Sequence, residues 1–177
     1  MAQHPLQWLS SPSRNLSLVL HVLGALSFAA NFHFLTVWDT PFNEAYGWHY
    51  QFLTILGLSI SLLSFVIGIV SDLTLSSTLF TLKNSLCIVA APVEVLISIL
   101  YWGIRAIDPE LLFPGEFQLP LLADIGFHLA PAIFLTLDLV LFSPPWTIPT
   151  YGVMSISLGL AFMYWYWVEL CFSHNGW

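Results

Sequence analysis

Ionisable side chains that interrupt apolar stretches are the residues of this sequence best suited to chemistry. Such residues are costly inside a membrane, and they commonly mark functional sites there. A hydroxyl near them also matters, because threonine becomes a nucleophile once a histidine takes its proton. The candidates are His21, His33, Thr54, Glu94, Asp124, His128, Asp138 and Glu169.

These residues are unevenly distributed along the depth of the helices that we expect to carry them. At about 1.5 Å of rise per residue, Thr54 lies roughly 5 Å and His128 roughly 10 Å below the same end of the bundle. Glu94 falls near the middle, and Asp138 approaches the opposite end. The pattern predicts a lipid-accessible polar pocket near connections 38–50 and 105–120, in the half that holds His33, His49, Thr54, Asp124, His128 and Glu169.

The composition identifies the environment of the chain. Of its 177 residues, 58% are hydrophobic and 7% are charged, whereas soluble domains carry about 25% charged residues. This excludes a soluble enzyme, a disordered chain and a secreted disulfide scaffold. The formal net charge of −7, with only three Lys and Arg residues, excludes nucleic-acid binding. We predict an integral membrane protein whose partners are the bilayer and a lipid substrate.

Five stretches approach or exceed the roughly 20 mostly apolar residues that a transmembrane helix needs. The fold class is therefore predicted to be all-α, as one membrane-embedded helical bundle over residues 1–177. Connections of this length make neighbouring helices antiparallel, with 72–85 and 143–149 as plain loops at one end. The predicted segments are 16–37, 51–71, 86–104, 121–142 and 150–172.

The cations give the expected orientation. Arg14 and Lys83 fall at one end of the bundle and Arg105 at the other. The excess of positive charge on cytoplasmic loops then places the N-terminus and residues 72–85 in the cytoplasm. The endoplasmic reticulum and the plasma membrane both suit such a protein.

Three residues near the predicted pocket keep two interpretations each. Asp124 lies one turn before His128, on the same helix face, and could orient the imidazole or bind a partner elsewhere. Arg105 suits a fatty carboxylate, but an arginine at a helix end also extends towards head groups. Glu169 could support the site or, like Glu94, act as a protonated structural donor. His49 is expected in a solvated loop, and Pro131 is expected to kink its helix beside His128.

Motifs that would specify other chemistries are missing from the sequence. It contains no Gly-x-Ser-x-Gly, His-Glu-x-x-His, P-loop, Gly-x-Gly-x-x-Gly or His-x-x-x-His pattern. We therefore expect neither a metal site nor a cofactor.

Three collinear motifs resemble the androgen-induced protein family, which includes the androgen-dependent TFPI-regulating protein. Residues 46–54 (YGWHYQFLT) are similar to the entry into that family's second helix. Pro92-Val93, Tyr101-Trp102, Asp108-Pro109-Glu110 and Pro114 resemble its third helix and the following loop. Gly126-Phe127-His128, with Pro131, resembles its fourth-helix histidine segment.

The resemblance implies a multi-pass hydrolase of fatty acid esters of hydroxy fatty acids, with a threonine nucleophile and a histidine base. Those roles fall on Thr54 and His128. The family often has Asn-His three and four residues before its key histidine, where this chain has Asp124 and Ile125. It also has six helices, so the resemblance implies a C-terminally truncated member that lacks the sixth, and both an active and an inactivated hydrolase remain open.

Two other classes of function are compatible with the sequence. The first alternative is a non-enzymatic membrane adaptor or regulator, which truncation would favour. The second is a proton-coupled carrier with Glu94, Asp138 and Glu169 as its relay. Release of free fatty acid from a branched lipid ester distinguishes the enzyme from both.

Overall fold

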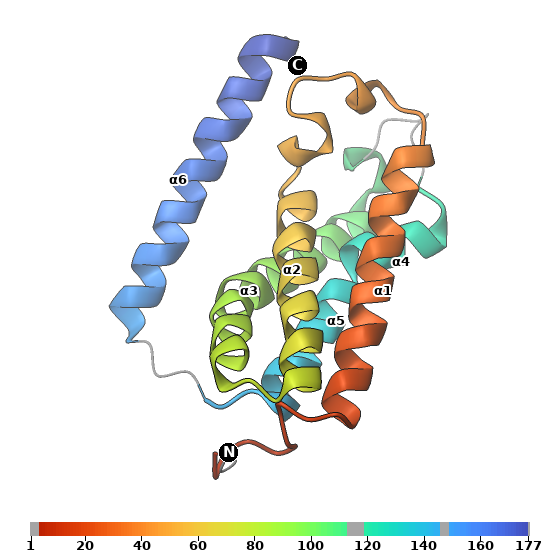
Figure 1. Ribbon diagram of the computed structural model, residues 1–177. Coiled ribbons are helices and arrows are strands. Elements are labelled where there is room, and N and C mark those ends of the chain that lie inside the picture. Colours follow the sequence, from red (N-terminus) through yellow and green to blue (C-terminus); the bar gives the residue numbers. More distant parts are fainter. Residues whose placement is uncertain (1–3, 113–118, 146–148, 177) are drawn as a thin grey trace.

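A computed structural model of the chain describes residues 4–112, 119–145 and 149–176. Within these ranges the regular structure is entirely helical, as predicted (Figure 1). Short 3₁₀ turns lie in the connections η1 (Pro41–Asn43), η2 (Trp48–Gln51) and η3 (Pro109–Leu111). The longer helices are α1 (Leu16–Val37), α2 (Leu53–Thr74), α3 (Ser77–Ile107), α4 (Leu121–His128), α5 (Ala130–Leu137) with its π-helical extension η4 (Asp138–Phe142), and α6 (Thr150–Asn175).

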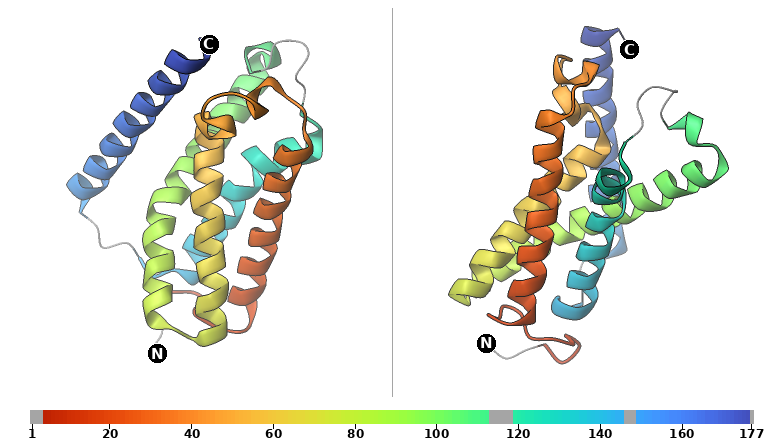
Figure 2. Two further views of the ribbon diagram at one scale, coloured as in Figure 1. Left: turned by 45° about the horizontal axis from the view of Figure 1, so that its top comes forward. Right: turned by 90° about the vertical axis from the view of Figure 1, so that its right-hand side faces the viewer.

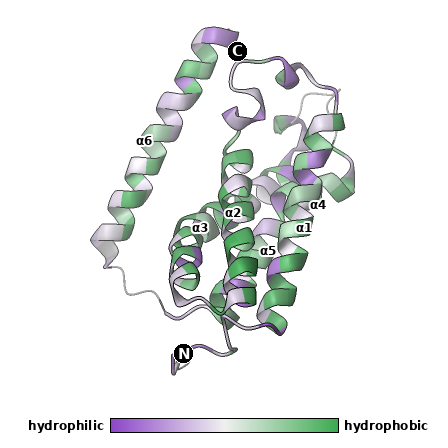
Figure 3. Cartoon of the chain, viewed as in Figure 1, coloured by the Kyte–Doolittle hydropathy of each residue, from purple (hydrophilic) through white to green (hydrophobic). Residues whose placement is uncertain are grey.

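Four of these helices, α1, α2, α3 and α6, are each long and apolar enough to cross a membrane. The pair α4 and α5–η4 adds a fifth span if the two halves, bent by 40°, cross together. Hydrophobic residues dominate the helices, while hydrophilic ones gather in the 38–52 connection (Figure 3). The described part of the chain thus has four or five membrane-spanning segments, in agreement with the sequence.

The connection predicted at 72–85 is wrong. Helix α2 runs to Thr74 and α3 begins at Ser77, so only two residues separate them. No Gly or Pro lies between Leu75 and Pro92 to stop a helix, and the Ser76 hydroxyl caps α3 by accepting from the Leu79 N–H. The polar residues that suggested a loop bond back to their own helix, as Thr81 and Ser85 do with carbonyls one turn earlier.

Pro131 breaks the fourth segment, as expected. It stands in the first turn of α5, where the absence of its N–H does no harm to the new helix. Leu129 leaves helical geometry, with φ −128° and ψ −47°, and separates α4 from α5. Helix α4 therefore ends at His128, which places that side chain at a discontinuity of the backbone.

Aromatic rings fill the centre of the bundle. Phe28 of α1 meets Phe65 of α2 and Phe134 of α5 edge-on, at centroid distances of 5.2 and 5.9 Å. Edge-to-face contacts of this kind contribute about 0.5–1.5 kcal/mol beyond the burial of area. This apolar core separates two polar regions at opposite ends of the bundle.

Four charged side chains are buried at the end that carries the α2–α3 turn. We call His21, Asp72, Lys83 and Asp138 the buried ion network. His21 Nδ1 lies 2.7 Å from Asp72, and its Nε2 lies 3.1 Å from Asp138. The Lys83 ammonium donates to both Asp138 oxygens, at 2.9 and 2.7 Å. If both carboxylates are ionised they only accept, so both His21 nitrogens donate, and two cations balance two anions.

The buried ion network corrects one expectation. The sequence places Lys83 in a cytoplasmic loop, yet it is fully buried in α3 and so cannot act as an exposed loop cation. The network also gathers three further charged residues around Asp138, which the sequence already locates near this end. Periodicity along one helix could not show this, because the four charges come from α1, α2, α3 and η4 and meet only through tertiary packing.

Helix α6 stands apart from the other helices (Figures 1 and 2). None of the residues in its most apolar membrane-spanning stretch is buried by the rest of the described chain. Its contacts with the rest of the chain concentrate on residues 46–53, at the end of the bundle where the chain terminates.

Removal of one charge from the buried ion network should destabilise the fold strongly. Lys83→Met leaves Asp138 with His21 as its only cation, and loss of one partner from a buried pair costs about 3–5 kcal/mol. The double variant Lys83→Met/Asp138→Asn keeps charge balance and should cost less than the sum of the two single variants. Unfolding in detergent micelles measures this, with exposed Asp39→Asn as the control, and strict additivity would contradict the network.

Candidate functional site

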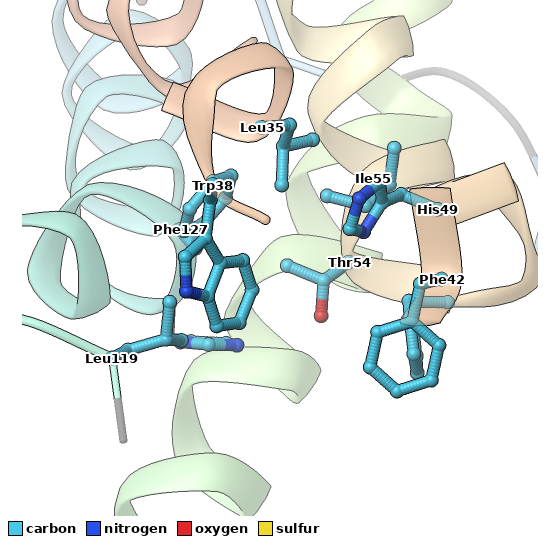
Figure 4. Close-up of a pocket in the computed structure, with 10 residues that line it drawn as sticks. Leu35, Trp38, Phe42, His49, Thr54, Ile55, Leu119 and Phe127 are labelled. Carbon is cyan, nitrogen blue, oxygen red and sulfur yellow. The ribbon is translucent and has the colours of Figure 1, made fainter. Parts of the chain in front are cut away.

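A pocket of about 90 Å³ lies at the 38–52 end of the bundle (Figure 4). Thr54 and His128, the two residues singled out by the sequence, both line it. The remaining walls are mostly apolar and aromatic, and they come from α1, the 38–52 connection, α2, α4 and the residues just before α4. They are Leu35, Trp38, Phe42, His49, Phe52, Ile55, Leu119 and Phe127.

The Thr54 hydroxyl points into the space between Trp38 and Phe42 (Figure 4). Serine and threonine in membrane helices commonly bond to the carbonyl one turn earlier. Ser59, Ser61 and Thr74 of the same helix do so. The Thr54 hydroxyl makes no hydrogen bond with any described residue, so it is not used to stabilise its own helix.

Thr54 is the second residue of α2, where backbone N–H groups have no partner within the helix. The neighbouring donors are used: Leu53 donates to the Tyr164 hydroxyl, and Ile55 and Leu56 donate to the Phe52 carbonyl. Among the described residues, none accepts from the Thr54 N–H. The hydroxyl therefore lies beside an unused backbone donor at the positive end of the helix dipole.

His128 is held by two neighbours. Its Nδ1 lies 2.9 Å from Asp124 Oδ1, and its ring stacks on Tyr101 at a centroid distance of 3.5 Å with planes 3° apart. An ionised carboxylate only accepts, so Nδ1 carries the hydrogen and the neutral ring has its lone pair on Nε2. None of the described residues binds Nε2, which leaves this nitrogen available as a base.

Asp124 is fully buried, and its other carboxylate oxygen pairs with Arg105. Arg105, about one-third exposed, also lies over the Trp102 ring, 5.2 Å from its centroid. The buried negative charge is thus compensated by a cation that reaches the edge of the bundle. Of the alternatives left by the sequence, the structure places Asp124 against His128, and it places Arg105 against Asp124.

The end of α4 is fixed to α1 by a buried hydrogen bond. Asn31 donates from its side-chain amide to the Gly126 carbonyl at 2.6 Å. The same amide fills the position that a Cβ at residue 126 would need, so only glycine allows this approach. Asn31 thereby sets the position of the turn that carries His128.

His49 is not in a solvated loop, contrary to expectation. Its side chain is 2% exposed, and it lies among Trp38, Phe42, Trp48 and Phe52. Burial lowers the pKa of His49 below its usual value of 6.5. Its Nε2 lies 2.9 Å from Asn43 Oδ1. The many aromatic residues of 38–52 could have indicated that His49 is enclosed. Their spacing in the sequence, however, does not predict how this connection folds.

Other polar residues of the predicted pocket lie elsewhere. Glu169 is exposed on α6, which contributes no lining residue to the pocket, and His33 is exposed on α1. Glu94 accepts from Ser61 at 3.3 Å. Asp138 belongs to the buried ion network, at the opposite end of the bundle. Within the described residues, Glu94, Asp138 and Glu169 thus make no contact with one another that would form a relay.

Substitution of Gly126 should disturb the site through Asn31. In Gly126→Ala the new methyl group displaces the amide, and either the hydrogen bond to α4 or the α1–α4 packing is lost, at a cost of about 1–3 kcal/mol. The matched control is Gly103→Ala, because a Cβ there meets nothing within 4 Å and alanine favours the helix. Thermal unfolding should show a lower midpoint only for Gly126→Ala; equal midpoints would contradict the contact.

Comparisons with known proteins place these features in context. The family model for FAR-17a/AIG1-like proteins matches residues 16–177. A UPF0641 membrane protein of Schizosaccharomyces pombe is 38% identical over 168 residues, which cover 93% of this chain and 75% of the relative. No solved structure matches the chain significantly.

Proposed function

Because this chain belongs to the FAR-17a/AIG1-like family of membrane proteins, we propose that it is a membrane-embedded hydrolase of lipid esters. The observation that carries the proposal is the shared pocket, in which an unbonded Thr54 hydroxyl and an unbonded His128 Nε2 both take part. A hydroxyl, a histidine with its lone pair on Nε2 and a carboxylate on Nδ1 are the three parts of the serine hydrolase triad.

The proposed reaction passes through an acyl-threonine. His128 Nε2 takes the Thr54 hydroxyl proton while the oxygen attacks the ester carbonyl. The tetrahedral adduct expels the alcohol, which receives that proton from Nε2. Water then attacks the acyl-threonine with His128 again as base, and the carboxylic acid leaves as Thr54 recovers its proton. Asp124 holds the imidazole and stabilises its charged form in both half-reactions.

The negative oxygen of the tetrahedral adduct needs donors that are in place before reaction. The Thr54 backbone N–H supplies one, since no described residue occupies it, and the α2 dipole adds positive potential at the same position. In chymotrypsin-like serine proteases the nucleophile's own N–H serves in this way.

The walls of the pocket and its setting in the bilayer support the proposed substrate class. Apolar and aromatic side chains line the space around Thr54, so acyl and alkyl chains suit it better than sugars or peptides. We propose fatty acid esters of hydroxy fatty acids, in agreement with the sequence resemblance. Such an ester would reach the pocket from within the membrane.

Turnover of such an ester by purified protein tests the function. Thr54→Ala should abolish release of free fatty acid, and Thr54→Ser should retain part of it because a hydroxyl remains. His128→Ala should lower turnover about 10²–10⁴-fold, the usual contribution of a general base. Asp124→Asn should lower it as well, since the amide can hold the imidazole in the wrong tautomer.

Thr74→Ala and His33→Ala are matched controls for these variants. Both side chains are outside the pocket, and Thr74 bonds only to its own helix. They should leave turnover unchanged. A Thr54→Ala protein that cleaves the ester as fast as the parent would refute the nucleophile, and complete absence of turnover in the parent would favour the adaptor.

A further inference from the structure

A deep apolar cleft separates α6 from α2 and α3. Two adjoining cavities, of about 660 and 340 Å³, form it, and they share lining residues from all three helices. Those shared residues are Leu53, Val89, Val93, Leu160 and Tyr164. None of the residues that line the cleft is charged, and none of them lines the pocket of Thr54 and His128.

Hydrogen bonds attach one end of α6 to residues 46–51. Asn175 and Tyr46 bond reciprocally, at 2.9 and 3.1 Å, between side-chain amide and backbone. Trp167 donates to the Tyr50 carbonyl at 2.9 Å, and the Tyr164 hydroxyl donates to the Gln51 carbonyl at 3.1 Å. From this attachment α6 runs apart from α2 and α3 (Figure 1). Residues of all three helices line the cleft.

Water does not suit the cleft. A buried water needs two to four polar partners. The polar groups of Tyr164 and Trp167 are already used by the backbone of residues 50–53. Among the lining residues, Ser157 and Tyr50 add two further hydroxyls, which are too few to hold a water cluster.

The setting of the cleft favours lipid as the occupant. Helix α6 is long and apolar enough to cross a membrane, and its membrane-spanning stretch is not buried by the rest of the described chain. The cleft beside it is therefore open to the hydrocarbon region of the bilayer, where acyl chains are the solvent.

We propose that the cleft binds one bilayer phospholipid, whose acyl chains fill the space between α6 and the α2–α3 pair. The attachment of α6 to residues 46–53 would lie at the interface, since Tyr50 and Trp167 are residue types that favour the level of the head groups. No lining residue offers a cation, so a zwitterionic head group suffices. The bound lipid would replace the protein packing that α6 lacks.

Photolabelling of the full chain in phosphatidylcholine nanodiscs tests this site. A phosphatidylcholine with a diazirine on one acyl chain is the probe, and peptide mass spectrometry locates the adducts. Labelling should be several-fold higher on cleft residues Leu160 and Met163 than on Phe162 and Tyr166, which are exposed on α6 but do not line the cleft. Labelling of the cleft residues should also persist when the protein is extracted into detergent before irradiation, because a specifically bound lipid stays in place.

Variants with a bulky side chain provide the matched comparison. Val93→Trp fills the cleft and should suppress labelling of Leu160 and Met163, whereas Ile99→Trp adds the same ring on an exposed part of α3 outside the cleft. Equal labelling of both sets of α6 residues in the parent protein would show only bulk lipid and would overturn the proposal. Unlabelled cleft residues that cross-link to a second copy would also overturn it.

Discussion

A charged side chain buried among apolar helices must be paired, because an uncompensated charge in that environment costs several kcal/mol. The described residues satisfy this constraint at both ends of the bundle. At the α2–α3 turn, His21 joins Asp72 to Asp138, and Lys83 completes the charge balance. At the 38–52 end, Asp124 lies between Arg105 and His128. Each group connects different helices, so pairing the charges also fixes how the helices pack.

The pairing of buried charges also sets the geometry of the candidate site. Arg105 lies beside the Asp124 carboxylate, and an ionised carboxylate there accepts from His128 Nδ1, which leaves the lone pair of the imidazole on Nε2. Pro131 ends α4 directly after that histidine, and Asn31 fixes the last turn through Gly126. Thr54 approaches the pocket from the first turn of α2. The site thus combines two helix ends with one buried ion pair.

The sequence predicted the elements of this fold well because apolar segment length depends on local composition. It also predicted comparable depths in the bundle for Thr54 and His128, because depth follows from the helical rise per residue. It could not show that Lys83 is buried, because the partner Asp138 is 55 residues away and is met only through packing. The sequence also predicts His49 in solvent, because the spacing of the nearby aromatic residues does not show that the 38–52 connection folds them around it.

If Thr54 and His128 act together on one ester bond, the protein should form an acyl-enzyme that can be trapped. The protein would be mixed with an activated fatty acyl ester and quenched in acid, and the acylated residue would be located by peptide mass spectrometry. We predict an acyl group on Thr54 in the parent protein and its loss, under the same brief exposure, in His128→Ala. An acyl group on another residue, or equal acylation of Thr54 without His128, would contradict it.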